Sequence, residues 1–169
     1  MALNTQVLTQ EMTHGFAGSY ARQPEMIVST RKVGGTAAIP FGTALKYSSG
    51  AVVAMGAGSA ATDFVGFAGR EFKSSLDYLN QTGEYAAGED ASVFQLGCIN
   101  VKCNKGTPAL NGAVYLRITA NASYPTAPVG GLEAEADSTN TVALTNLRWN
   151  GAADANGIAE VRILTMINA

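Results

Sequence analysis

The stretch ASVFQLGCINVKC, residues 91–103, consists of two short apolar runs on either side of Gly97. A glycine inside a strand pattern indicates a bend or a bulge, so we expect one long ribbon with a bend or a bulge at Gly97. On a single strand, Cys98 and Cys103 would point to opposite faces, because side chains alternate along a strand. A disulfide between them is therefore not expected, and two thiols alone do not form a zinc site.

Shorter strand patterns, separated by glycine-rich turns, continue on both sides of this ribbon. They lie at residues 25–33, 43–47, 51–55, 64–68, 113–118, 141–144 and 158–163. Around eight strands at roughly ten-residue spacing predict an all-β fold, either an antiparallel β-sandwich or a barrel. Ser48-Ser49-Gly50 and Asn111-Gly112 predict tight turns. The best helical pattern, at 72–79, would make only about two turns.

The first 24 residues differ from the rest of the chain. They are polar, contain Gly15 and Gly18, and end at Pro24. We expect an extended N-terminal arm at residues 1–24, followed by a single β-rich domain at residues 25–169, since no linker divides the remainder.

The composition excludes several classes of partner. Charged residues make up 14% of the chain, the net charge is −2 and the pI is about 5.3. A nucleic-acid-binding protein needs a cationic footprint, and a basic stripe for anionic lipids is also missing. No apolar run is long enough to span a membrane, and the N-terminus does not match a secretory signal. We therefore expect neither nucleic acid nor a membrane as a partner, and a surface so poor in charge predicts contact with other proteins.

One motif resembles a dinucleotide-binding turn. In AVVAMGAGSAAT, residues 51–62, Gly56, Gly58 and Ala61 fit G-x-G-x-x-A. That site requires a helix directly after the glycines and a parallel sheet. The following TDFVGFAG, residues 62–69, disfavours a helix, so we interpret the motif as a small-residue turn between antiparallel strands. No cofactor is expected.

No cluster of titratable residues predicts catalysis or metal binding. His14 is the only histidine and lies in the predicted arm, which argues against a Ser-His-Asp site and excludes a multi-histidine metal site. Glu133 and Glu135 would share a strand face, but a glycosidase pair normally lies in an aromatic-lined cleft. ADANG, residues 153–157, lacks the ligand pattern of a calcium loop and predicts a turn with positive φ at Gly157. We expect no catalytic residues, no metal and no enzymatic activity.

Several segments match a known family when they are taken together and in order. They are IPFGTALKY (39–47), ATDFVGFAGRE (61–71), YAAGEDASVFQLGCINVKC (85–103), GAVYLRI (112–118), APVGGLEAEAD (127–137) and NLRWNGAADANGIAEVRI (146–163). In this order they resemble the structural cement (decoration) proteins of phage capsids. The resemblance covers most of residues 36–169 and does not include the arm.

This resemblance implies a non-enzymatic virion protein, made in the host cytoplasm, on the outer surface of an icosahedral capsid. Such proteins bridge neighbouring major capsid subunits and stabilise the shell against the pressure of packaged DNA. The implied partners are the major capsid protein and further copies of this chain, as a dimer or trimer. The mechanism that we expect is strand addition, in which arm residues pair with an exposed sheet edge of the capsid.

The predicted contact residues lie in the arm. Val7, Leu8 and Met12 are apolar side chains that need a surface on which to be buried, and Phe16 and Tyr20 are aromatic residues of the kind that anchor interfaces.

The alternative function is a receptor- or glycan-binding β-domain of the adhesin or tail-fibre type. It would use surface aromatic residues in a shallow groove, and Trp149 is the only tryptophan in the chain.

Overall fold

The structure, a computed structural model, describes residues 13–22, 25–70 and 83–166. Its strands are β1 (Ile27–Lys32), β2 (Ile39–Pro40), β3 (Ala44–Ser48), β4 (Ala51–Ala54), β5 (Gly66–Ala68), β6 (Glu84–Tyr85), β7 (Asp90–Lys105), β8 (Ala113–Arg117), β9 (Leu132–Glu133), β10 (Thr141–Trp149) and β11 (Ile158–Ile163). Two 3-10 helices, η1 (Ala61–Asp63) and η2 (Ser138–Asn140), are the only helical turns among the described residues, none of which forms a helix that could cross a membrane. The all-β prediction is confirmed, and the helical pattern at 72–79 lies outside the described residues.

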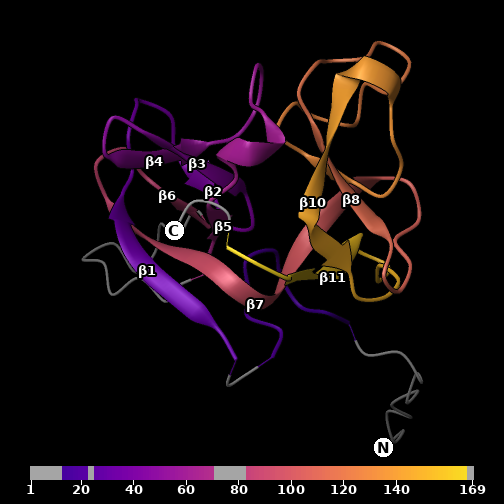
Figure 1. Cartoon of the computed structure of the whole chain (residues 1–169), viewed down its shortest axis with the longest axis horizontal. Helices are drawn as coiled ribbons and strands as arrows, with labels where there is room; N and C mark the ends of the chain where they lie inside the picture. The colour runs from indigo at the N-terminus through magenta and orange to yellow at the C-terminus, as the bar shows by residue number, and fades with distance from the viewer. Residues whose placement is uncertain (1–12, 23–24, 71–82, 167–169) are drawn as a thin grey trace, which may run out of the picture.

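Strand β7 runs through both halves of the molecule (Figure 1). Its first half pairs with β1 and β5, and its second half pairs with β11 and β9. The pairing partner changes at the middle of the strand, because Leu96 lies opposite Ile27 of β1 and Gly97 lies opposite Ile163 of β11. Gly97 has a φ of 110°, so the prediction of one ribbon bent at this glycine is confirmed.

The second half of β7 belongs to a closed five-stranded barrel. The hydrogen-bonded order is β7–β11–β10–β8–β9 and back to β7, with β7–β9 as the only parallel pair of the five. Side chains from alternate positions fill the interior, including Ile99, Val101, Leu116, Leu147 and Val161, all fully buried. Of the two predicted architectures, this half of the molecule, which we name the barrel lobe, adopts the barrel.

The first half of β7 belongs to a second group of strands, which we name the N-terminal lobe. Here β1, β7, β5, β3 and β4 follow one another, and a bridge between Val33 and Val52 joins the two outer strands. The β3–β4 hairpin turns at Ser49 and Gly50, whose φ angles of 49° and 80° fit the predicted tight turn.

The two lobes share a hydrophobic core. Phe64, Phe67 and Phe94 of the N-terminal lobe pack in the same cluster as the barrel interior. Trp149 of β10 belongs to this cluster and is 1% exposed. The large aromatic residues therefore hold the lobes together.

Residues 13–22 of the predicted arm lie against β7. Their backbone exchanges three hydrogen bonds with it, from Gly18 N to the Asn100 carbonyl (2.7 Å), from Asn100 N to the Ser19 carbonyl (2.9 Å) and from Ala21 N to the Cys98 carbonyl (2.9 Å). These bonds satisfy the edge of β7 between β1 and β9. Arm residues 1–12 and 23–24 lie outside the described residues.

Candidate interaction surfaces

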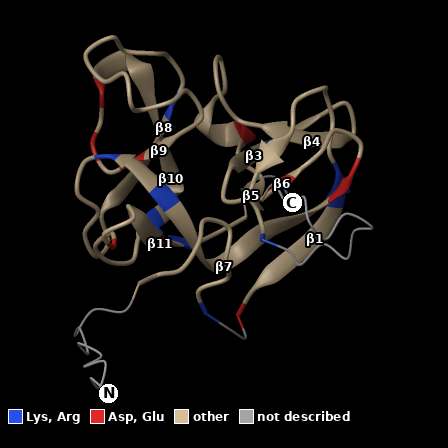
Figure 2. Ribbon diagram, turned by 180° about the vertical axis from the view of Figure 1, so that it is seen from behind, with Lys and Arg blue, Asp and Glu red and all other residues tan. Residues whose placement is uncertain are grey.

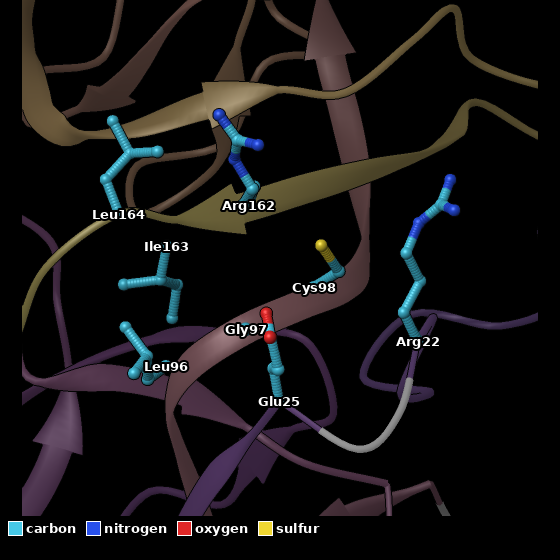
Figure 3. A pocket seen from close by; sticks show the side chains of 8 residues that line it. All are labelled: Arg22, Glu25, Leu96, Gly97, Cys98, Arg162, Ile163 and Leu164. Carbon is cyan, nitrogen blue, oxygen red and sulfur yellow. The ribbon is translucent and has the colours of Figure 1, made fainter.

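A pocket opens at the bend of β7 (Figure 3). Its volume is about 460 Å³, and it is lined by residues 96–98 and 162–164 together with Arg22 and Glu25. Leu96, Ile163 and Leu164 supply apolar surface, while the charged side chains come from different segments around them (Figure 3). We name it the bend pocket.

An ion pair fixes residues 13–22 beside the bend pocket. The Arg22 guanidinium donates two hydrogen bonds to the carboxylate of Glu160, at 2.7 and 3.2 Å, and the Asn150 amide donates a third at 2.6 Å. Burial opposes the ionisation of Glu160, but the hydrogen bonds from Arg22 and Asn150 outweigh it and hold its pKa below the ordinary value of 4.5. The carboxylate is therefore ionised at neutral pH and holds Arg22 in place.

The stability contribution of Glu160 should depend on pH. Because its pKa is lower in the folded protein than in the unfolded chain, the contribution is complete above about pH 4.5 and is lost as the pH falls through the folded-state pKa. Replacement by Gln at pH 7 should cost about 1 kcal/mol, since Arg22 is largely exposed and the pair is screened. Urea denaturation from pH 7 to pH 3 should therefore show a smaller loss of stability in Glu160→Gln than in the wild type. Parallel curves for the two proteins would contradict this role.

The two cysteines are free, as expected. Burial raises the pKa of Cys98 to about 11 and also raises that of Cys103. Both thiols are protonated at neutral pH, so neither is an activated nucleophile.

A second concave surface lies between the two lobes, and we name it the interlobe cleft. Its volume is about 400 Å³, and it is lined by segments 40–43, 54–55 and 128–132 together with Ala17, Lys102 and Asn104. Met55 and Leu132 are buried there, and Val129 is 40% exposed. The cleft and the bend pocket share no lining residue.

A long ordered loop forms one wall of the interlobe cleft. Residues 118–130 contain no Asp, Glu, Lys or Arg, and we name them the uncharged loop. A hydrogen bond of 2.8 Å from Gly130 N to the Arg117 carbonyl closes it at its base, so it has the form of an Ω-loop. Tyr124, which is 42% exposed, lies under the Lys105 ammonium at 4.0 Å from its ring centroid. In Figure 2 charged residues are few and scattered along the ribbon, and this loop adds to the uncharged surface.

A buried ion cluster supports the uncharged loop. The fully buried Arg117 guanidinium donates hydrogen bonds to both carboxylate oxygens of the equally buried Glu133 and lies 2.8 Å from a carboxylate oxygen of Asp137. These bonds raise the pKa of Arg117. The Asn121 amide, within the loop, donates to Asp137 at 2.9 Å, and together with Arg117 it lowers the pKa of Asp137. The cluster therefore joins β8, β9 and the residue before η2 to the loop.

The structure also answers the question of a carboxylate pair at Glu133 and Glu135. Glu133 is buried against Arg117, whereas the side chain of Glu135 is 61% exposed and lies 4.0 Å from Lys105. The two carboxylates have different environments and do not face a common cleft. The pairing of Arg117 with Glu133 is not evident from the sequence, because a charged residue in a strand pattern does not reveal its burial.

The predicted contact residues have different positions. Val7, Leu8 and Met12 lie outside the described residues. Phe16 is 64% exposed, with the Arg70 guanidinium 4.3 Å from its ring centroid. Tyr20 stacks on Phe94 at a centroid distance of 5.3 Å, so its ring packs within its own chain.

The glycine motif is a turn, as predicted, but the prediction that it joins antiparallel strands is wrong, because β4 and β5 both pair antiparallel with β3 and so run in the same direction. Gly58 has a φ of 69°, and the segment continues into the single-turn η1 before β5, which pairs antiparallel with β3. The predicted turn at 153–157 is also confirmed, since Gly157 has a φ of 74° and the Asp154 carboxylate accepts hydrogen bonds from the backbone of this turn. Within the described ranges, no group of three or more His, Cys, Asp or Glu side chains could hold a metal ion.

Comparisons with known proteins agree with the fold and identify the family. The family model described as structural cement protein (E217 gp24/Pam3 gp6) matches residues 3–164. A chain of the solved structure "The capsid of Myoviridae Phage XM1" superposes with a TM-score of 0.71 at 22% identity, covering 98% of this chain and 99% of that chain, which shows a common fold. No match is found among curated proteins. The chain belongs to the phage structural cement protein family and is a capsid-associated structural protein.

Proposed function

We propose that the protein binds the outer surface of an icosahedral phage capsid and bridges neighbouring major capsid subunits. Many such contacts, repeated over the lattice, would stabilise the shell against the pressure of the packaged DNA, because multivalent attachment raises the effective affinity. The role is mechanical and requires no catalytic group.

The presence of two separate concave surfaces carries this proposal. A protein that bridges two neighbours needs two contact sites, and the bend pocket and the interlobe cleft lie at different positions along β7. Their linings differ, since Arg22, Glu25 and Arg162 line the bend pocket whereas Lys102 is the charged residue that lines the cleft. The two sites are therefore suited to different surfaces of the shell.

Glycan binding has less support. Its strongest stacking group would be Trp149, which is 1% exposed and packs in the shared core. Sugars bind to exposed aromatic faces, so this side chain does not serve that purpose.

Co-sedimentation with mature, undecorated shells of the source phage tests the proposal. We expect saturable binding at a fixed ratio to the capsid protein and a higher temperature of shell disruption when the sites are occupied. Folded protein that does not bind the shells would refute the capsid role, and binding without shell stabilisation would refute the bridging role.

The arm prediction requires a separate variant. Replacement of Val7, Leu8 and Met12 by Ser should weaken shell binding more than tenfold if these side chains are buried on the capsid, since each loses roughly 1–2 kcal/mol of apolar burial. Residues 13–22, which pack on β7, remain intact in this variant, so its thermal unfolding should match the wild type. Shell binding equal to the wild type would exclude the arm mechanism and leave the two concave surfaces as the contact sites.

A further inference from the structure

The interlobe cleft has an unbalanced charge. Lys102 is exposed at its wall, and no Asp or Glu belongs to the residues that line it. On the neighbouring strand, Lys102 lies opposite the apolar Ile158. In the part of the chain that the structure describes, no carboxylate lies within ion-pair distance of the Lys102 ammonium. A solvated lysine on an otherwise uncharged wall provides an attractive site for an anionic group.

The rest of the cleft surface is apolar and small. Met55 and Leu132 lie at its base, Ala54 and Val129 at its exposed margin, and Phe41 packs edge-on against Tyr85 at one end. Glycine and proline fill most of the remaining positions in segments 40–43 and 128–132. A groove with few large side chains leaves room for a peptide backbone and for one apolar side chain at a time.

The walls of the cleft are held in fixed positions. Gly130 approaches the other lobe so closely that a Cβ atom there would lie 2.6 Å from the Met55 carbonyl oxygen. In the wall that the N-terminal lobe supplies, the backbone N–H of Gly42 donates a hydrogen bond of 2.7 Å to the Ala68 carbonyl. A groove that is already formed loses little conformational entropy on binding, which favours affinity.

We propose that the interlobe cleft binds an extended segment of the capsid shell protein that carries an apolar side chain and a neighbouring carboxylate. The apolar side chain lies on Met55 and Leu132, and the carboxylate pairs with Lys102. This inference rests on the proposed function and assigns one of the two contact sites.

Two substitutions test the cleft in the full-length protein by co-sedimentation with undecorated shells. Lys102→Glu reverses the charge and should weaken binding about three- to tenfold, more at low salt than at high salt. Ala54→Trp fills the cleft from its exposed margin and should weaken binding more than tenfold. The matched controls, Lys46→Glu on β3 and Ala57→Trp in a neighbouring turn, replace residues that do not line the cleft and should bind like the wild type.

The identity of the occupant is tested by a photo-crosslinking residue at position 54. We expect a crosslink to a shell-protein peptide that contains Asp or Glu. A crosslink to a second copy of this chain, or to a neutral or basic segment, would overturn the inference. Wild-type affinity in both cleft variants would also overturn the inference but would leave the capsid role intact. If the wild-type protein itself does not bind the shells, both the capsid role and the inference are refuted.

Discussion

Arg117→Met is expected to lower the free energy of unfolding by about 3–5 kcal/mol, because it leaves the carboxylate of Glu133 buried without a cation. Both side chains are 0% exposed, so water does not replace the lost partner. Asp137 keeps its hydrogen bonds from Asn121 and is partly exposed. The cost therefore comes mainly from Glu133.

Urea denaturation at pH 7 measures this loss, and two further variants interpret it. The double variant Arg117→Met/Glu133→Leu removes both charges and should recover a large part of the stability, because an apolar pair of similar volume is tolerated in a core. Arg148→Met removes a half-buried arginine that bonds only backbone carbonyls among the described residues and should cost less than about 1 kcal/mol. Arg117→Met within about 1 kcal/mol of the wild type would contradict the assignment of a buried ion cluster.

The buried cluster also has a consequence for binding. It joins Asn121 of the uncharged loop to β8 and β9, and the same loop forms a wall of the interlobe cleft. If the double variant folds, it retains the barrel but loses the links that Arg117 makes to Asp137 and to the Thr119 carbonyl. Its affinity for shells should therefore fall more than its stability alone explains.

Most strands could be predicted from the sequence, because the apolar runs and glycine-rich turns that mark them lie within a few consecutive residues. Each of the eight predicted strand regions contains an observed strand, and the missed strands β2, β6 and β9 have only two residues each. Two residues are too few to show an alternating pattern. Their position depends on partners far away in the chain, such as Cys103 for Leu132 of β9.

The closure of the barrel and the positions of the candidate sites could not be predicted from the sequence, because both depend on contacts between segments that are far apart in the chain. Short strand patterns separated by glycine-rich turns are typical of an antiparallel sandwich and of a barrel alike, so they do not reveal which of the two forms. The interlobe cleft combines segments 40–43 and 128–132, which only the tertiary fold brings together. Likewise, Arg117 and Glu133 look like solvent-exposed charges until their pairing across β8 and β9 is known.

The contacts of the N-terminal arm could not be predicted either, because they depend on the tertiary fold. A polar, glycine-containing segment with little apolar character predicts extension, but it does not reveal which backbone groups will be satisfied. Hydrogen bonds between residues 18–21 and β7 fill a strand edge that the sheet leaves open between β1 and β9. Tyr20, predicted as an interface anchor, stacks on Phe94 of its own chain.

Gly97→Ala should destabilise the protein by about 3 kcal/mol or more, because it combines two separate costs. The φ of 110° at Gly97 is a conformation that residues with a Cβ atom rarely adopt. A Cβ atom would also lie 2.5 Å from the carbonyl oxygen of Glu25 and 3.1 Å from the Phe94 ring. The first contact is with backbone, so relief requires a shift of the segment that leads into β1.

Gly88→Ala separates these two costs. Gly88 also has a positive φ, 83°, but no atom lies within 4 Å of the position that its Cβ would occupy. Gly88→Ala should lower the free energy of unfolding by only about 1 kcal/mol, because it strains the backbone conformation but creates no close contact. A similar small loss for Gly97→Ala in urea denaturation would mean that β7 bends without a tight contact at Glu25. The larger loss that we expect would mean that one glycine allows a single strand to serve both lobes, because β1 and β11 meet there on the same ribbon.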